Sequence, residues 1–456
     1  MNTILRHFQG EFLRRLLLIA FPIALQTMLF SSRSLVDIMM LGQLGELDVA
    51  AIGIAGRAVF VATLMIFGVT TGGALLTAQY WGAGNRRGVQ QSTALTILMT
   101  LLAALGAGLI FLFAPQAVIG MATNSEAVIA LGSEYLMITA FSLFTMAWGS
   151  SIAVGLRAMH QPGIATFFSA IGIVLNIFLN WVLIFGHFGF PALGIAGAAW
   201  ATLLSGLIEA VLLYVYLSRR QHLLAMNLRL LLGAVELGKI RRFLSLSMPT
   251  TFNHLAWSLG IFAYHAIIGQ SGVQGLAALS VMTPIESFAL ALLIGISNAS
   301  AVLIGNQLGA NNHEAAYYQA WAVSLFNFCC AVVVALVMVL CKDLVLDLFS
   351  ALSGESRALA EHFFLIFAVA VVVKSIPMTM IVGVLRAGGD IRFCLYQDMV
   401  AQWLIGIPLT AFCAFILQLP LEWIYAMLIV EELVKSVGST IRLKSRSWMN
   451  NLVADG

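Results

Sequence analysis

Charged residues are scarce in this chain of 456 residues: Asp, Glu, Lys and Arg together make up 9% of it. A soluble protein carries roughly 25% charged residues. Hydrophobic residues make up 61%, and the mean hydropathy is +0.98. This composition excludes an ordinary soluble domain and predicts an integral membrane protein with several spans in the lipid bilayer. The net charge of +3 is too small to indicate a nucleic-acid-binding protein.

Residues and motifs for metal, redox or nucleotide chemistry are also lacking. The phosphate-binding pattern GXXXXGK[ST] and the zinc motif HEXXH are both absent, so no ATP-driven motor and no metal site is predicted. An intramembrane enzyme would need a nucleophile–base pair or a metal cluster, and no such spacing occurs. We therefore expect no enzyme activity and no cofactor. The five cysteines lie mostly in apolar runs, which argues against a disulfide framework: Cys329, Cys330, Cys341, Cys394 and Cys413.

Long apolar runs, in contrast, are abundant. A helix needs about 20 apolar residues to cross the hydrocarbon core of a bilayer. Twelve such runs are predicted between polar or Gly/Pro breaks. They lie near residues 14–41, 51–80, 93–118, 129–156, 165–186, 194–218, 243–269, 276–306, 318–342, 361–386, 396–418 and 422–441.

Lysine and arginine are distributed unevenly between the two sides that these spans define. If the N-terminus is cytoplasmic, most of the 23 basic residues fall in inner segments, from Arg6 near the start to Arg446 near the end. The outer loops hold Arg357, with Lys342 at an outer helix end. This asymmetry fits the positive-inside rule. It predicts a multi-pass membrane protein with both termini in the cytoplasm; the family resemblance described below further implies the bacterial inner membrane.

The two halves of the chain repeat one plan. The longest inner loop lies near the midpoint, and motifs before it recur after it at a shift of 227 residues. An even number of spans per repeat gives parallel repeats with a cavity between them. We predict an N-terminal lobe (residues 1–218), a cytoplasmic linker (219–242) and a C-terminal lobe (243–456). The matches are Pro22 with Pro249, "LGQLG" (41–45) with "IGQSG" (268–272), and "AQYWGAGN" (78–85) with "GNQLGANN" (305–312).

These motifs, with "VDIMMLGQLG" (36–45), "GLRAMHQPG" (155–163) and "NIFLNWVLIFG" (176–186), resemble the multidrug and toxic compound extrusion (MATE) family. The resemblance covers essentially the whole chain and is strongest to bacterial NorM- and VcmN-type members. It implies an all-α integral membrane protein with twelve transmembrane helices in two six-helix bundles, the MATE/MOP-type fold. It also implies export of drugs and organic cations by antiport with H⁺ or Na⁺.

One carboxylate interrupts the first span. An Asp at a helix centre costs about 2.5–3.5 kcal/mol on insertion scales. Asp37 could pair with Arg33, one turn earlier, in a purely structural role. Asn176 and Asn180, at i and i+4, share one face of the fifth span, and asparagines often only join helices. The family resemblance instead implies one buried cluster of Asp37, Asn176, Asn180 and Thr202.

Such a cluster suits proton coupling. Burial favours the neutral form of a carboxyl group, and amides can hydrogen-bond either form. Pro22, in the same span, removes a helix hydrogen bond. We therefore expect protonation of Asp37 to favour a bent first span, which would shrink the cavity of the N-terminal lobe and expel cargo.

The second half does not repeat Asp37: the shift of 227 places Tyr264 opposite it. The resemblance implies that sodium-coupled NorM-like members carry acidic residues in the seventh and tenth spans. Here neither span contains an acid in its middle, which lowers the case for a sodium site there and favours protons. Glu286 and Lys374 are expected to pair across the C-terminal lobe, or else to face the central cleft. There, Glu286 would suit a cationic substrate.

The sequence thus predicts a monomeric multidrug efflux antiporter that exports organic, often cationic compounds in exchange for protons through Asp37. A Na⁺-coupled drug antiporter is one alternative. A lipid-precursor flippase of the same superfamily is another; it would need a strongly basic cavity, for which only Arg57 and Lys374 are candidates.

Overall fold

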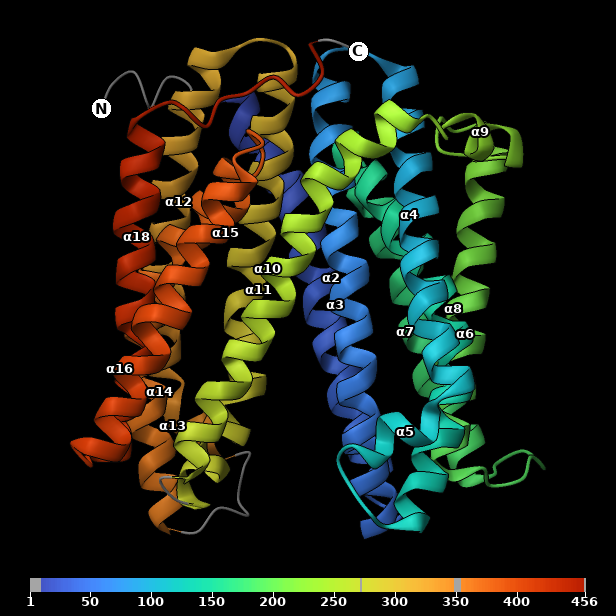
Figure 1. Ribbon diagram of the computed structural model, residues 1–456, viewed down its shortest axis with the longest axis vertical. Coiled ribbons are helices and arrows are strands. Elements are labelled where there is room, and N and C mark those ends of the chain that lie inside the picture. The colour runs from blue at the N-terminus through green and yellow to red at the C-terminus, as the bar shows by residue number, and fades with distance from the viewer. Residues whose placement is uncertain (1–9, 271–272, 348–353, 455–456) are drawn as a thin grey trace. The chain divides into compact units, whose positions relative to one another are not determined.

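The computed structural model describes residues 10–270, 273–347 and 354–454, and in these ranges all regular structure is helical (Figure 1). The predicted all-α class is therefore confirmed. Arg6 and the last two residues of the "IGQSG" motif lie outside the described ranges. The helices, in chain order, are α2 (Glu11–Leu41), α3 (Glu46–Gly82), α4 (Arg86–Phe113), α5 (Pro115–Gly120), α6 (Glu126–Ala158), α7 (Pro162–Phe185), α8 (Gly194–Arg219), α9 (Leu228–Gly233), α10 (Leu237–Gln270), α11 (Val273–Gly309), α12 (His313–Leu340), α13 (Lys342–Asp347), α14 (Gly354–Pro377), η1 (Met378–Leu385), α15 (Ile391–Met399), η2 (Val400–Gly406), α16 (Ile407–Ala411), η3 (Phe412–Ile416), α17 (Leu421–Ala426) and α18 (Leu428–Lys444).

Ten of these helical segments are long and apolar enough to cross a membrane. The other two predicted spans, 243–269 and 422–441, fall in α10 and in α17–α18. Both are helical but more polar than the rest. Helix α10 begins with a basic stretch in the predicted linker 219–242, which also contains α9. Helix α18 has 17 residues and carries three charged side chains in its first half, Glu431, Glu432 and Lys435.

The chain divides into two compact units. Unit 1 comprises residues up to Met28, the segment Ala78–Gly84, and the chain from Phe252 onward. Unit 2 comprises Leu29–Thr77 and Asn85–Thr251. Helices α2, α3 and α10 each contribute residues to both units, so three boundaries fall within helices and the fourth, after Gly84, falls in the turn between α3 and α4; none falls in the predicted linker 219–242.

Unit 2 contains α4, α6, α7 and α8, which pack side by side (Figure 1). Helices α7 and α8 approach closely because small residues line their contact. A side chain at Gly197 of α8 would lie 2.6 Å from the carbonyl oxygen of Leu183 in α7. Helix α7 ends at Phe185 and is followed by the capping residue Gly186, whose positive φ of 76° is readily adopted by glycine. The close contact between α7 and α8 holds the polar residues of the fifth and sixth spans next to one another.

In unit 1, α11 packs against α12, α14 and η1. The C-terminal tail is anchored here: the indole of Trp448 is fully buried, and Gln79 donates hydrogen bonds to the carbonyls of Ala387 (2.8 Å) and Asn450 (3.1 Å). Three π-helical segments, η1, η2 and η3, interrupt the regular helices of this unit. Such segments are rare and occur frequently near functional sites.

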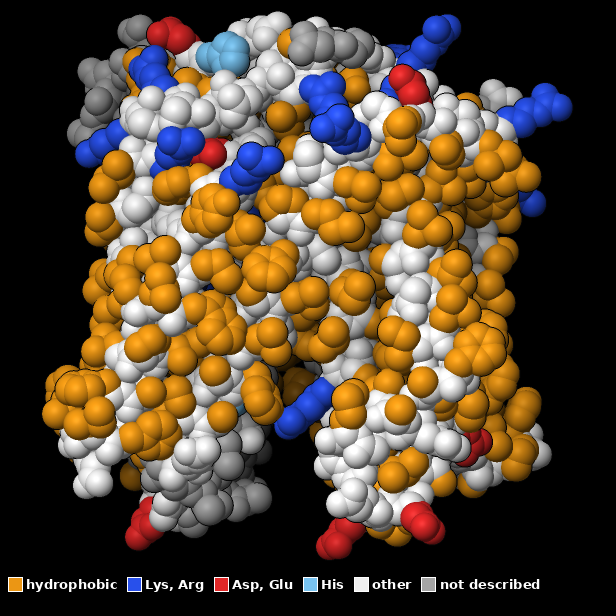
Figure 2. Space-filling model, viewed as in Figure 1, with side chains coloured by type: hydrophobic (Ala, Val, Ile, Leu, Met, Phe, Trp, Pro, Cys, Tyr) orange, Lys and Arg blue, Asp and Glu red, His pale blue; other side chains and the backbone are white. Residues whose placement is uncertain are grey.

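Both units have the surface of a membrane protein. On the face drawn in Figure 2, hydrophobic side chains cover the helices between their ends, and the Lys and Arg side chains gather mainly near one end. Large apolar side chains are strongly exposed along the spans, for example Phe21 (68%), Ile38 (68%) and Leu404 (70%). In water such a surface would be unfavourable, and in lipid it is the expected one.

Candidate functional site

The structure brings together the four polar residues of the first, fifth and sixth spans. Asp37 lies on α2, Asn176 and Asn180 on α7, and Thr202 on α8. The Asn180 amide donates to Asp37 Oδ1 (2.5 Å) and lies 3.4 Å from Asn176 Oδ1. Asn176 Nδ2 in turn lies 3.4 Å from the Thr202 hydroxyl. Both asparagines are almost fully buried. Their i, i+4 spacing places both amides on one face of α7.

Arg33 belongs to the same cluster. Its Nε lies 3.7 Å from Asp37 Oδ2, and a terminal nitrogen donates to Thr202 Oγ1 (3.1 Å). The distance to Asp37 is that of a loose ion pair, longer than a good charge-assisted hydrogen bond. The i, i+4 pair considered from the sequence is therefore present, but Arg33 also connects α2 to α8. The cluster thus holds a carboxylate, a guanidinium, two amides and a hydroxyl.

This arrangement can accommodate Asp37 in either charge state. The ionised carboxylate accepts from Asn180 and is attracted by Arg33. The carboxylic acid would need an acceptor, and the buried Oδ1 of Asn180 has no hydrogen-bond partner in the described structure. An amide can offer its NH₂ to a carboxylate or its oxygen to an acid. The side chain of Asp37 is 27% exposed, so the site is not sealed.

Pro22 lies within α2, fifteen residues before Asp37, and the helix is continuous from Glu11 to Leu41. At 1.5 Å per residue the two positions are about 22 Å apart along the helix axis. A bend at Pro22 would therefore act on Asp37 through the length of the helix and not through direct contact. The predicted bending of this span stays a prediction.

Glu286 and Lys374 have different partners, so the expected pairing between them is not found in the part of the chain that the structure describes. Glu286 on α11 accepts a hydrogen bond from Tyr425 (2.8 Å). Lys374 on α14 lies 3.8 Å from Glu432 on α18. The sequence could not supply this answer, because the acid that pairs with Lys374 comes from the last helix, more than fifty residues away.

A buried ion pair in unit 1 was missed by the sequence reasoning. Glu431 and Lys435 of α18 form an i, i+4 ion pair, and both side chains are less than one-tenth exposed. The phenol of Tyr264 donates to the other oxygen of Glu431 (2.5 Å). Tyr264 is the residue that the repeat places opposite Asp37. The second half thus has a carboxylate near this position, but it comes from a different helix.

A second buried acid of unit 1 lies on α15. Asp398 accepts a hydrogen bond from Asn253 (2.8 Å) and lies 3.7 Å from a guanidinium nitrogen of Arg386. The lack of acids in the seventh and tenth spans therefore does not leave this half without buried carboxylates. The middles of the seventh and tenth spans contain no acid, as the sequence shows, and the acids of this half lie on the eighth, eleventh and twelfth spans, as Glu286, Asp398 and Glu431. The Glu431–Lys435 ion pair could have been predicted from the sequence, because opposite charges four residues apart in the last span lie on one face of a helix.

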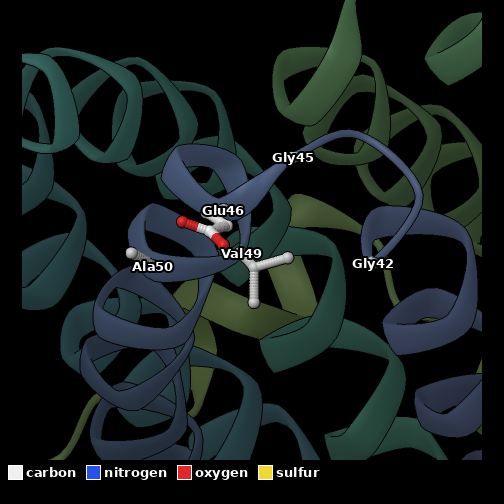
Figure 3. Close-up of a pocket in the computed structure, with 5 residues that line it drawn as sticks. All are labelled: Gly42, Gly45, Glu46, Val49 and Ala50. Atoms are coloured by element: carbon white, nitrogen blue, oxygen red, sulfur yellow. The ribbon is translucent and has the colours of Figure 1, made fainter.

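A shallow pocket lies at the turn between α2 and α3 (Figure 3). It is lined by Gly42, Gly45, Glu46, Val49 and Ala50, and Asp37 does not line it. Among the described residues no group of three or more His, Cys, Asp or Glu side chains is arranged to hold a metal ion. The pocket therefore does not define the site, and the buried polar clusters do.

A polytopic helical protein with ionisable side chains buried within its spans has the features of a membrane transporter, because such residues mark ion and substrate pathways. The comparison with known families gives the particular family. The MatE family model matches residues 22–182 and again residues 249–412, so the chain belongs to the MatE family. The two matches begin 227 residues apart, which is the shift found within the sequence. Members of this family are transporters and not enzymes.

Relatives match over nearly the whole chain. The transporter YisQ of Bacillus subtilis, whose function is uncharacterized, is 25% identical over 444 residues, covering 96% of this chain and 95% of YisQ. A probable multidrug resistance protein NorM of Rhizobium meliloti is 29% identical over 393 residues, covering 84% and 82%. A solved outward-facing multidrug resistance MATE family transporter of the MOP superfamily aligns with a TM-score of 0.87, at 18% identity, over 97% and 98% of the two chains. The predicted twelve-helix MATE-type fold is thus confirmed.

Proposed function

We propose that this protein is a multidrug efflux antiporter that exports organic, often cationic compounds in exchange for protons, coupled through protonation of Asp37. The observation that carries the proposal is the pair of polar partners on the Asp37 carboxylate, the Asn180 amide at 2.5 Å and the Arg33 guanidinium at 3.7 Å. The multidrug substrate class is supported by the NorM relatives.

In the proposed cycle, Asp37 takes a proton from the outer side and releases it to the cytoplasm. Protonation removes the negative charge that attracts Arg33. The Asn180 amide can then turn its oxygen toward the acid. The hydrogen bond between Asp37 on α2 and Asn180 on α7 is then no longer made to a charged group and is weaker, which frees α2 to bend near Pro22. Both termini would be cytoplasmic, the protein would work as a monomer in the bacterial inner membrane, and residues 1–218 and 243–456 would act as two lobes.

The test is transport of ethidium in proteoliposomes under an imposed pH gradient or an imposed Na⁺ gradient, each applied alone. Asp37→Asn keeps the size of the side chain and removes its titration. We expect this variant to lose pH-driven ethidium transport while still binding ethidium. The control is Glu126→Gln, an equivalent change at an exposed acid in the first turn of α6, which should transport like the wild type. Wild-type transport by Asp37→Asn would refute the proposal.

Coupling to Na⁺ is the second candidate, and one observation favours it. The buried Asn180 Oδ1 has no hydrogen-bond partner in the described structure, and it lies on the same side chain that contacts Asp37. Together with the carboxylate it would offer oxygen ligands to a hard cation. In the experiment above, ethidium transport driven by a Na⁺ gradient at equal pH would establish this alternative and exclude strict proton coupling.

The flippase alternative has less support. Pyrophosphate-bearing lipid precursors would require basic side chains whose charge is not already neutralised. Lys374 lies 3.8 Å from Glu432, so its charge is at least partly compensated.

A further inference from the structure

The linker of residues 219–242 is folded onto one end of unit 2. Gln90 on α4 donates to the carbonyl oxygen of Leu223 (2.9 Å), and helix α9 packs against α4. Leu224 is almost fully buried and lies over Gly155 of α6, where a Cβ would come within 2.7 Å of Leu224 Cδ1. These contacts hold the linker beside the ends of α4 and α8, where Figure 1 shows α9.

The outward side of the folded linker is apolar. Four large hydrophobic side chains project from it, and each is more than half exposed: Leu228, Leu232, Val235 and Leu237. Leu228 and Leu232 are four residues apart, so they lie on the same face of α9. The contact with the rest of unit 2 is made by other apolar residues of the linker, such as Leu224. The four exposed side chains therefore form a separate apolar surface.

Positive charge surrounds this apolar surface. Five arginines of the linker provide it: Arg219, Arg220, Arg229, Arg241 and Arg242. Within the described ranges, no carboxylate oxygen lies within 4.0 Å of their guanidinium groups. Glu236 is the acid of this segment, and it is already paired with Lys239 at 2.7 Å. The linker thus combines exposed leucines with arginine charges that no acid compensates.

The neighbouring helix places this surface at the edge of the membrane. Helix α8 exposes apolar side chains to lipid as far as Val215. The guanidinium of Arg220 then lies over the ring of Tyr216, 5.9 Å from its centroid. Tyrosine and arginine are typical of the headgroup level of a bilayer. On the face drawn in Figure 2, the basic side chains also gather mainly near this end of the spans.

We propose that the exposed side chains of residues 219–242, here called the linker surface, dock onto anionic phospholipid. The leucines enter the boundary between the headgroups and the acyl chains, as an interfacial amphipathic segment does. The arginines bind the lipid phosphates, because a guanidinium matches a phosphate with two parallel hydrogen bonds. A zwitterionic lipid offers the same acyl chains without net charge, so anionic lipid is preferred. The proposal does not depend on which ion or substrate the protein transports.

The test uses the full-length protein in nanodiscs of phosphatidylcholine and phosphatidylglycerol, with a trace of a photoactivatable analogue of one lipid or the other. Cross-linked peptides are identified by mass spectrometry after digestion with chymotrypsin. In the wild type, we expect the phosphatidylglycerol probe to label residues 219–242 more strongly than the phosphatidylcholine probe does. An arginine near an anionic membrane surface contributes about fivefold to binding. Arg229→Gln/Arg241→Gln should therefore lower the phosphatidylglycerol labelling by about tenfold or more.

Two further variants separate charge from apolar contact. Arg86→Gln/Arg87→Gln is the matched control: it removes two exposed arginines at the start of α4, in the same unit, and no large hydrophobic side chain is strongly exposed among the described residues 68–101. Labelling of residues 219–242 should stay at the wild-type level in this control. Leu228→Ser/Leu232→Ser keeps all arginines and should lower the labelling by both probes.

Several outcomes would overturn the proposal. Equal labelling of residues 219–242 by the two probes in the wild type would refute the preference for anionic lipid. Loss of that preference in an excess of inorganic phosphate would assign the arginines to a soluble anion instead. Light scattering might give a wild-type dimer that Leu228→Ser/Leu232→Ser dissociates, and the leucines would then belong to a second copy of the chain.

The wild type supplies a measurement that needs no variant. At about 1 M salt the Debye length is about 3 Å, so contacts between exposed arginines and headgroups are strongly screened. The preference for phosphatidylglycerol should then decrease, while labelling by the phosphatidylcholine probe should change little. If Arg229→Gln/Arg241→Gln does not fold, a preference that salt leaves unchanged would still refute the docking of arginines onto anionic headgroups.

Discussion

Replacing Lys435 with methionine should destabilise the protein more than a typical single substitution. Lys435 and Glu431 form an ion pair on α18, with side-chain exposures of 7% and 6%. Methionine keeps most of the volume and removes the charge. Within the described chain, no other cation lies within 4.0 Å of Glu431. The variant therefore leaves a buried carboxylate without its counter-charge.

The magnitude follows from what remains around Glu431. Breaking a buried pair by removing one partner costs about 3–5 kcal/mol. Tyr264 still donates to the carboxylate, and a hydrogen bond to a charged group contributes about 1.5–3 kcal/mol. Glu432 retains Lys374 at 3.8 Å and adds no new unpaired charge. We therefore expect a loss near the lower limit, about 3 kcal/mol.

The assay is equilibrium unfolding in detergent micelles, followed by tryptophan fluorescence. The double variant Glu431→Gln/Lys435→Met removes both charges and keeps an acceptor for Tyr264. We expect it to recover most of the loss, because replacing a whole buried pair is often nearly neutral. The control is Arg15→Met, which breaks the exposed i, i+4 pair with Glu11 and should change little. A single variant as stable as wild type, or a double variant no better than the single, would refute the reasoning.

Two further predictions concern unit 2. Burial lowers the pKa of His222, whose neutral ring accepts from the Leu224 N–H (3.2 Å) and contacts Gln161 Oε1 (3.0 Å). Because the unfolded chain binds this proton more readily, stability should fall as pH drops below about 6.5; melting curves at several pH values should show a weaker dependence in His222→Asn. Gly197→Val should destabilise by about 1–3 kcal/mol, since its side chain would meet the carbonyl of Leu183. Equilibrium unfolding measures this loss, and a variant at wild-type stability would contradict the close α7–α8 contact.

Part of the polar cluster in the first half could be predicted from the sequence, because two of its residues are close together in the chain. Asn176 and Asn180 are four residues apart in an apolar helix, so their shared face follows from helix geometry. Which helices face that stripe does not follow from spacing, and the family resemblance supplied it. The double role of Arg33 could not be read from sequence, because its reach to Thr202 depends on how α2 and α8 pack.

In the second half, most of the residues that pair are far apart in the chain, so their spacing does not predict these pairs. The partners of Lys374 and Tyr264 both come from α18, the least apolar of the predicted spans. The search for sodium ligands considered the seventh and tenth spans. Asp398 and Glu431 instead lie in the eleventh and twelfth spans, the counterparts of the fifth and sixth spans that carry Asn176, Asn180 and Thr202. The pairing of Glu286 with Lys374 failed for the same reason: proximity in space depends on helix packing.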